Sequence, residues 1–318
     1  MSYHDIKIIS TSERDVLFDK YRGRFLYEKK ADIYGVCVKL ITDIEWIKDA
    51  WEENFYSMSE NIRSHGRLLV LFDSDVEPQI MYDPVSKTVI MFNIDYYGKI
   101  KSIALSNAGD ILEDNHGIYS VHGACIDYNG SGICIIAPSG AGKTTHTYGL
   151  LRYNGVRVVS DDWFYARVYG ANDILAFSSE KNFYIRADII DIWPEYRNIS
   201  HRIKFDNKGR SIIHINWIVG KERLRTMATL KTTILLKRDY DDPEKVVEVE
   251  PGEALKYLER NDYFNPHMLV LNEYKERIRR KFFNTLLHST KIFTVNTTSP
   301  PEETNRILYE TVKSSVKD

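Results

Sequence analysis

The sequence predicts an α/β protein in two domains, and three observations lead to this prediction. The chain has 318 residues, more than one hydrophobic core usually organises. From residue 113 onward, apolar strand-like runs alternate with glycine-rich turns and helix-like stretches, as is typical of an α/β core. Residues 1–112 instead mix short strand-like runs with a helix-like stretch, which predicts a smaller α+β domain whose role the sequence does not indicate. The expected domains are therefore 1–112 and 113–318.

The bulk composition indicates an ordinary globular protein. Apolar residues make up 43% of the chain and charged residues 28%, which is enough to build a sizeable core. The 43 basic and 45 acidic residues give a formal net charge of −2, which disfavours a nucleic acid partner without excluding a local basic patch. The N-terminus lacks a signal-peptide pattern, and no apolar run reaches the ~18 residues of a membrane span. We expect a cytoplasmic protein with no membrane partner.

Hydrophobic patterning predicts the elements of each domain. In the first domain, strands are expected at 35–41, 67–72 and 88–97, and a helix within 43–62. In the second, strands are expected at 132–136, 156–160, 164–170, 174–179, 232–237 and 291–296, and helices at 266–289 and 301–316. Three scattered cysteines, Cys37, Cys125 and Cys134, are too few for a disulfide framework or a zinc cluster. Cys125 and Cys134 lie in apolar runs, where a core role is expected.

The strongest local pattern is a phosphate-binding loop. Residues 132–153 read GICIIAPSGAGKTTHTYGLLRY, a buried strand, a loop of small residues and a helix expected to open at Thr144. Gly140 and Gly142 would let backbone N–H groups turn toward phosphate oxygens, Lys143 would reach the β- and γ-phosphates, and Thr144 would bind Mg²⁺. Ala137 stands where the P-loop pattern has its first glycine, and alanine suffices if φ is negative there. The candidate nucleotide-binding residues are Ser139, Gly140, Ala141, Gly142, Lys143, Thr144 and Thr145.

An acidic pair and a histidine are the candidate catalytic residues beside this loop. Asp161 and Asp162 end the apolar run VVSDDW, where a P-loop protein carries a carboxylate that holds the metal. Neighbouring residues of a strand point to opposite faces, so one carboxylate would serve Mg²⁺ and the other an acceptor hydroxyl, unless the strand has already ended. Asp161 is the candidate metal ligand with Thr144, and which aspartate is the general base stays open. His122 precedes the P-loop strand, from which an Asn129–Gly130 turn separates it.

These motifs together resemble a known family. VHGACIDYNGSGICIIAPSGAGKTT followed by GVRVVSDDW is similar to the bacterial HPr kinase/phosphorylases and, more distantly, to the ATP-dependent phosphoenolpyruvate carboxykinases. The resemblance covers roughly residues 117–168. It implies a mixed β-sheet P-loop kinase core, use of ATP with Mg²⁺, and a catalytic site of His122, Asp161 and Asp162. It also implies a homo-oligomer as one possible assembly.

The chain departs from that family in two places. The HPr enzymes carry a glutamate directly after the GK[ST] element, where this chain has Thr145, and their E-x-R-G motif has no match. The nearest run, SSEKNFYIRADIID, contains Lys181 and Arg186. Arg186 is a candidate catalytic residue because an arginine there would stabilise charge on the transferring phosphoryl group.

The sequence therefore predicts an ATP-dependent kinase whose acceptor is a hydroxyl, either a serine of a protein or peptide or a small-molecule alcohol. Two alternatives stay open. One is a carboxykinase-like enzyme that couples phosphoryl transfer to a carboxylic substrate. The other is a regulatory module that binds ATP without transferring phosphate.

Overall fold

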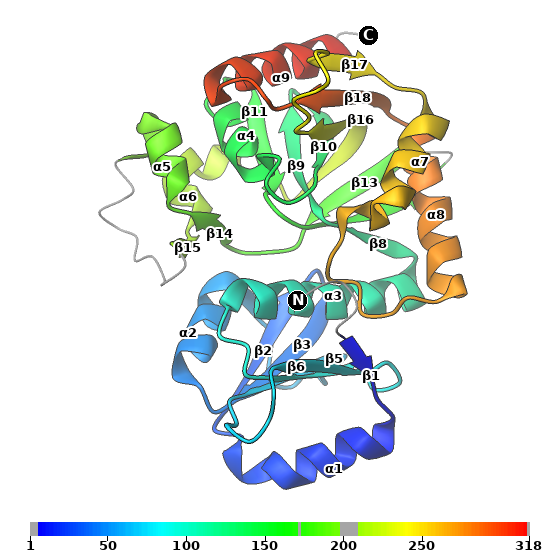
Figure 1. Cartoon of the computed structure of the whole chain (residues 1–318). Coiled ribbons are helices and arrows are strands. Elements are labelled where there is room, and N and C mark those ends of the chain that lie inside the picture. Colours follow the sequence, from blue (N-terminus) through cyan, green and yellow to red (C-terminus); the bar gives the residue numbers. More distant parts are fainter. Residues whose placement is uncertain (1–5, 171–172, 198–208, 317–318) are drawn as a thin grey trace. The chain divides into compact units, whose positions relative to one another are not determined.

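The computed structural model describes residues 6–170, 173–197 and 209–316 (Figure 1). The chain forms two compact units. Unit 1 comprises Met1–Ile118, Glu180–Asn182 and Pro266–Asn272, and unit 2 comprises Tyr119–Ser179, Phe183–Asn265 and Glu273–Asp318. Unit 1 ends its first segment at Ile118 rather than near residue 112, because helix α3 continues to His116 and ends on Gly117 in the left-handed conformation. Both units combine helices with a mixed sheet, which confirms the α/β class.

Unit 1 is built on a seven-stranded sheet with the order β1-β6-β7-β5-β3-β2-β4. Its strands are β1 (Ile6–Ile8), β2 (Tyr27–Ile33), β3 (Val36–Thr42), β4 (Tyr56–Ser57), β5 (Gly66–Leu71), β6 (Gln79–Asp83) and β7 (Thr88–Phe92). The central strands β3, β5 and β7 run parallel, and β2 and β6 flank them antiparallel. The expected strands at 35–41 and 67–72 are confirmed. The expected strand at 88–97 ends at Phe92, because Asn93 takes a positive φ of 57°.

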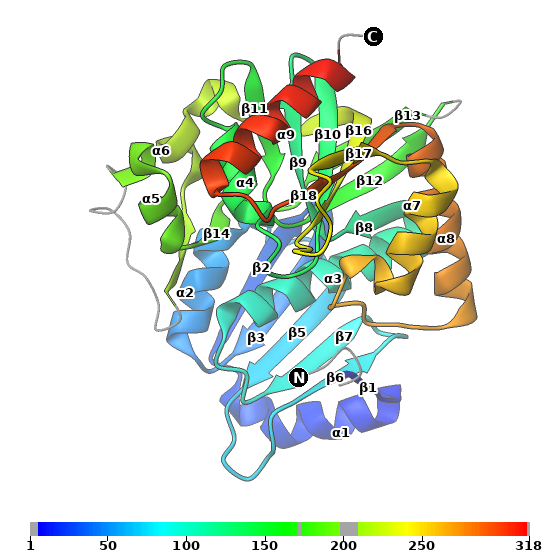
Figure 2. The same cartoon turned by 45° about the horizontal axis from the view of Figure 1, so that its top comes forward.

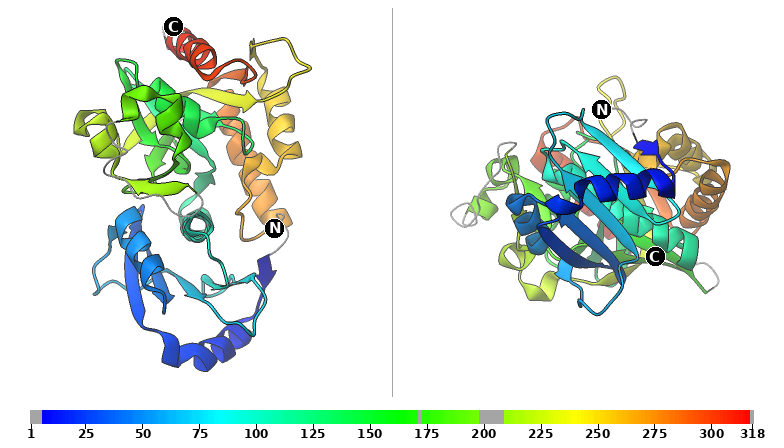
Figure 3. Two further views of the ribbon diagram at one scale, coloured as in Figure 1. Left: turned by 60° about the vertical axis from the view of Figure 1, so that its left-hand side comes forward. Right: turned by 90° about the horizontal axis from the view of Figure 1, so that it is seen from below.

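Helices cover both faces of this sheet. They are α1 (Thr11–Tyr21), α2 (Glu45–Asn54) and α3 (Tyr97–His116), with a short 3₁₀ turn η1 (Arg22–Arg24) after α1. Leu69, Leu71 and Phe92 pack with Tyr21 of α1 in one apolar cluster. The right-hand view of Figure 3 shows α1, in dark blue, crossing in front of the strands. Side chains alternate along a strand, so Leu68 and Val70 point to the opposite face, on which α3 lies.

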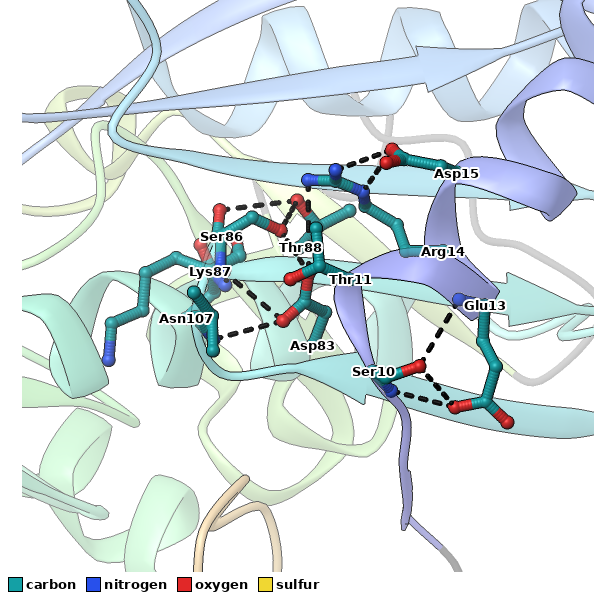
Figure 4. A network of polar contacts seen from close by, with 11 residues as sticks. Ser10, Thr11, Glu13, Arg14, Asp15, Asp83, Ser86, Lys87, Thr88 and Asn107 are labelled. Carbon is teal, nitrogen blue, oxygen red and sulfur yellow. Dashed lines mark hydrogen bonds and ion pairs between the residues drawn. The ribbon is translucent and has the colours of Figure 1, made fainter.

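Polar contacts fix the start of α1 to the turn between β6 and β7 (Figure 4). Ser10 and Glu13 form a capping box in which each side chain bonds the backbone N–H of the other. The Thr11 hydroxyl donates to the buried Asp83 carboxylate at 3.2 Å. Asp83 also accepts from the Ser86 hydroxyl at 2.6 Å and the Val85 N–H at 3.0 Å. These bonds satisfy a carboxylate that burial would otherwise destabilise.

Two short segments from later in the chain complete unit 1. Glu180 forms a buried ion pair with Lys101 of α3 at 3.2 Å and accepts a hydrogen bond from Asn54 of α2 at 3.0 Å. The second segment, 266–272, is not helical, although a helix was expected to begin at residue 266. The Ser106 hydroxyl on α3 donates to the His267 carbonyl in this segment. Both contacts tie α3 to residues that lie far along the sequence.

Unit 2 contains a nine-stranded mixed sheet. Seven strands follow the order β11-β9-β10-β16-β13-β12-β8, while β18 pairs with β16 and β17 with β18. The strands are β8 (Ile118–Val121), β9 (Gly123–Tyr128), β10 (Ser131–Ile136), β11 (Val156–Ser160), β12 (Phe164–Tyr169), β13 (Asp173–Ser178), β16 (Met227–Lys237), β17 (Val246–Glu248) and β18 (Lys291–Asn296). Strand β16 runs parallel to both β10 and β18. The pairs β9–β10, β9–β11, β12–β13, β13–β16 and β17–β18 are antiparallel.

Helices pack on both faces of the unit 2 sheet (Figure 2). They are α4 (Lys143–Leu150), α7 (Pro251–Arg260), α8 (Glu273–His288) and α9 (Pro301–Ser315). Along β10, Ile133 and Ile135 face a cluster with α4 and α9, and Cys134 and Ile136 face a cluster with α7 and α8. Cys125 joins the second cluster, which confirms that Cys125 and Cys134 are core residues. No helix in the described ranges has the length and apolar character needed to cross a membrane.

A small peripheral part of unit 2 follows β13. It contains a two-stranded sheet of β14 (Phe183–Arg186) and β15 (Arg210–Ile213), the helices α5 (Asp188–Ile192) and α6 (Ile215–Val219), and the 3₁₀ turn η3 (Lys221–Arg223). Ile185 and Ile213 from this sheet join the core on the α4 side. The two-stranded sheet therefore packs on the same side of the unit 2 sheet as α4, the helix that follows the phosphate loop.

Candidate functional site

The phosphate loop connects β10 to α4, as the sequence predicts. Ala137 is buried, and it is not among the described residues with positive φ, so the absence of a glycine there places no strain on the backbone. Gly140 and Gly142 have φ values of 84° and 91°. A side chain at either position would be strained, so these glycines permit the loop to turn. The helix begins at Lys143, one residue before the expected start at Thr144.

The start of α4 offers backbone donors to a ligand. Gly142 caps the helix without a side-chain hydrogen bond, and the first intrahelical bond runs from the N–H of His146 to the Gly142 carbonyl. The N–H groups of Lys143, Thr144 and Thr145 therefore precede the first helical hydrogen bond. Ser139 and Gly140 are exposed at the tip of the loop. A partly exposed helix start that has no side-chain cap and follows a loop with two left-handed glycines can bind an anion.

The two aspartates differ in exposure because β11 ends before them. The strand stops at Ser160, and Asp161 and Asp162 follow in a bend. Asp161 is 2% exposed, whereas the side chain of Asp162 is 30% exposed. The alternation of side chains along a strand therefore does not apply to this pair, and Asp162 is the more exposed of the two carboxylates.

Lys143, Asp162 and His122 meet at one point. The Nζ of Lys143 lies 3.0 Å from the Oδ1 of Asp162, and the same oxygen lies 3.5 Å from the Nε2 of His122. His122 occupies the residue between β8 and β9, and its ring tilts against Trp163 with centroids 5.8 Å apart. The Asn129–Gly130 turn, with φ values of 51° and 94°, joins β9 to β10 as expected.

The hydrogen bond at the other nitrogen of His122 determines its tautomer. The Nδ1 of His122 donates to the carbonyl of Phe264 at 2.5 Å, and a carbonyl can only accept. In neutral His122 the proton is then on Nδ1, and Nε2 faces Asp162 as a base. Burial and, after it, the Lys143 charge lower the pKa of His122, while Asp162 opposes that shift. His122 is thus favoured in the neutral form that can accept a proton.

The remaining candidate residues lie elsewhere in the two units. Arg186, at the end of β14, has a 62% exposed side chain and pairs with Asp188 at 3.1 Å. Lys181 belongs to unit 1, where its Nζ donates to the Glu52 carbonyl at 2.8 Å. The contacts recorded for these residues therefore do not join them to the Lys143–Asp162–His122 cluster. Thr145 bonds through its carbonyl to the indole N–H of Trp193 at 2.8 Å.

Sequence reasoning missed the element that orients His122. The turn η4 (Asp262–Phe264) has positive φ values at all three residues and presents the Phe264 carbonyl. This carbonyl lies 142 residues after His122 in the chain. An Asn-Asp pair before an aromatic run was the only local signal, and it indicates a turn without indicating its partner.

The residues present are compatible with a bound Mg²⁺. Within the described ranges, no group of three or more His, Cys, Asp or Glu residues could hold a metal by itself. Magnesium in nucleotide sites usually rests on one or two protein oxygens together with phosphate oxygens and water. Thr144 is partly buried at the start of α4, and Asp161 and Asp162 follow β11. This set of oxygens suits a metal carried in with a nucleotide.

Comparisons with known proteins leave the family open. No protein-family model matches the chain, and no curated protein sequence matches it significantly.

Proposed function

We propose that this protein is an ATP-dependent kinase that transfers the γ-phosphoryl group to a hydroxyl acceptor. The observation that carries the proposal is the cluster at the phosphate loop, where Asp162 lies 3.0 Å from the Nζ of Lys143 and 3.5 Å from the Nε2 of His122. A lysine can bind phosphate oxygens, and a carboxylate beside a neutral imidazole can take the proton of an alcohol, so this cluster supplies groups that suit phosphoryl transfer.

In this proposal the loop from Ala137 to Thr144 holds the triphosphate. The N–H groups at the start of α4 and the Nζ of Lys143 bind phosphate oxygens. Thr144 and Asp161 would hold Mg²⁺, which supplies positive charge to the β- and γ-phosphates when bound. Lys143 pairs with Asp162 in the structure, so nucleotide binding would draw Lys143 toward the phosphates and leave Asp162 more basic.

Asp162 then serves as the general base, with His122 beside it. The acceptor oxygen attacks the γ-phosphorus in line, the bond between the γ-phosphorus and the bridging oxygen breaks, and ADP leaves. The hydroxyl proton passes to Asp162, and the Nε2 of His122 stabilises it there or receives it in turn. Asp162 is favoured over Asp161 because its side chain is accessible, whereas Asp161 is buried. The product is a phosphate ester.

The resemblance to the HPr kinase and phosphoenolpyruvate carboxykinase group adds support of a different kind. In unit 2, the histidine comes directly before β9, the loop follows β10, and the aspartates follow β11. Strand β9 lies between β10 and β11 and pairs antiparallel with both. We propose that this mixed sheet is a P-loop kinase core of that type. The acceptor is a serine of a protein or peptide, or a small-molecule alcohol.

The test is to incubate the purified protein with γ-labelled ATP, Mg²⁺ and a fractionated cell extract. We expect label to enter one class of acceptor, protein or small molecule, and to be absent with Lys143→Ala. Asp173→Asn is the control and is expected to behave as wild type, because Asp173 is an exposed residue at the start of β13 in the same unit. Oxaloacetate-dependent nucleotide turnover would favour a carboxykinase-like reaction instead. Tight ATP binding without any transfer would replace the kinase with a regulatory ATP-binding module.

A further inference from the structure

A second cation, Arg238, lies near the phosphate loop, directly after the end of β16, the strand that runs parallel to β10. Strand β16 runs parallel to β10, and their register pairs Ile136 with Leu235. Ser139 lies three residues after Ile136, and Arg238 lies three residues after Leu235. Parallel strands release their following loops at the same edge of a sheet, so Arg238 leaves the sheet at the edge where the phosphate loop begins.

The backbone around Arg238 is held firmly by the end of β18. The buried Asn296 side chain donates to the carbonyls of Asp239 at 2.6 Å and Asp242 at 2.9 Å, and accepts from the Asp239 N–H at 3.1 Å. Thr297 donates its N–H to the Lys237 carbonyl at 2.8 Å. The residues on either side of Arg238 are therefore fixed. A side chain on a fixed backbone loses less entropy when it binds a ligand.

The guanidinium of Arg238 reaches the helix start. Its Nη2 lies 3.6 Å from where a methyl group on Gly142 would stand, and the His146 ring borders the same point at about 3.0 Å. Its Nε donates to the Thr297 hydroxyl at 3.3 Å. Among the described residues, Arg238 forms this one hydrogen bond. The residue is exposed. The Nη2 group thus lies close to the helix start, on a residue that is exposed to solvent.

We propose that Arg238 is a nucleotide-binding residue that donates to the phosphate chain through its Nη groups. This inference rests on the proposed nucleotide site and adds a residue to it. A guanidinium presents a planar pair of donors that matches phosphate oxygens. Lys143 forms an ion pair with Asp162 in the structure, which it would have to leave to bind a phosphate. Arg238 can bind a phosphate without first breaking an ion pair with any described residue. The alternative is that Arg238 stacks on the nucleobase, and that role would not require its Nη2 to lie near Gly142.

The experiment measures dissociation constants by calorimetry for ATP and for inorganic tripolyphosphate, a probe that lacks the nucleoside. Arg238→Ala is expected to weaken both ligands by roughly 10- to 100-fold, and Arg238→Lys to recover part of the loss. Lys231→Ala is the matched control, because Lys231 is an exposed cation within β16 that pairs with Asp173. This control should bind both ligands as wild type does.

Three outcomes would overturn the inference. If Arg238→Ala weakened ATP and left tripolyphosphate unchanged, Arg238 would contact the nucleoside instead. If the variant bound both ligands normally while Lys143→Ala did not, the nucleotide site would stand and the role of Arg238 would be wrong. If the wild-type protein bound neither ligand, the proposed function would fail together with this inference. Circular dichroism of each variant checks that its fold is unchanged.

Discussion

At the residue scale, Asp162 contacts Lys143 and His122, which act on it in different ways. Lys143 stabilises the carboxylate as an anion, whereas His122 presents an imidazole nitrogen to the same oxygen. The Phe264 carbonyl fixes the proton of neutral His122 on Nδ1. A proton that reaches Asp162 would therefore lie between the Asp162 carboxylate and the Nε2 of His122. Both groups can hold it, so this arrangement suits removal of a proton from an acceptor.

Asp162→Asn tests this assignment. An amide keeps the size of the carboxylate but cannot take a proton, so we expect kcat to fall by roughly 10²- to 10⁴-fold with ATP affinity changed little. Single-turnover kinetics and calorimetry measure the two quantities separately. Asp188→Asn, which alters a carboxylate paired with Arg186, is the control. Full turnover by Asp162→Asn would show that another group is the base.

His146 predicts how stability depends on pH. Burial and, after it, the Arg238 charge lower the pKa of His146 to about 4, whereas the unfolded chain binds this proton near pH 6.5. Between those values the unfolded state holds more protons, so the free energy of unfolding falls as pH decreases from 6.5 toward 4. The loss approaches about 3 kcal/mol. Well above pH 6.5 the residue is neutral in both states and has no effect on this dependence.

Urea unfolding of wild type and His146→Gln at pH 7 and pH 4.5 measures this contribution. Because other groups also titrate in this range, including His122 with its lowered pKa, the readout is the difference between the two proteins. We expect the variant to lose less stability on acidification. Equal losses in both would contradict the burial account.

At the scale of elements, the contact between α4 and α9 explains a glycine inside a helix. A methyl group on Gly149 would lie 2.3 Å from the Nδ2 of Asn305 on α9 and 2.6 Å from the Trp193 ring. Asn305 is buried and donates to the His146 carbonyl at 3.0 Å. The two helices thus approach more closely than any side chain at residue 149 would permit.

Gly149→Ala should consequently destabilise the protein by about 1–3 kcal/mol, although alanine favours a helix. Gly252→Ala in α7 is the matched control, since a methyl group there meets nothing within 4 Å. That change should be neutral or stabilising by up to about 1 kcal/mol. Thermal unfolding of both variants compares the two. Stabilisation by Gly149→Ala would mean that α4 and α9 are less tightly packed.

The buried pair of Lys101 and Glu180 should be important for unit 1. Glu180→Ala removes the carboxylate beside a buried ammonium, so we expect a loss of about 2–5 kcal/mol. Asp173→Ala, which breaks the exposed pair with Lys231, should cost less than about 1 kcal/mol. Urea denaturation followed by tryptophan fluorescence measures both changes. A small effect of Glu180→Ala would show that residues 180–182 contribute little to unit 1.

The success of sequence reasoning depended on how local each feature is. The turns at Gly140, Gly142 and Asn129–Gly130 depend on residues that are adjacent in the sequence. These turns were predicted correctly. Helix α3 was missed because sixteen of its residues are buried, which removes the one-sided pattern that reveals a surface helix. Likewise, the apolar run at 266–272 suggested a helix but belongs to unit 1. The Phe264 carbonyl and Arg238 come close to the site only because segments far apart in the sequence lie together in the fold. No pattern of neighbouring residues predicts such contacts.

At the scale of the whole molecule, each unit is assembled from separated stretches of the chain. Unit 1 takes residues from three segments, and so does unit 2. Residues 1–118 alone lack the Glu180 partner of Lys101 and Asn54. A fragment that ends at Ile118 is consequently not equivalent to unit 1.

The interleaved segments have a consequence for synthesis on the ribosome. Residues that complete unit 1 extend to Asn272, so most of unit 2 must be translated before unit 1 has all its parts. N-terminal domains of many proteins fold before the rest of the chain emerges, but here unit 1 has all its segments only after residue 272 has been made. Until residue 180 has been made, Lys101 and Asn54 of the nascent chain therefore lack the carboxylate that they contact in the folded protein.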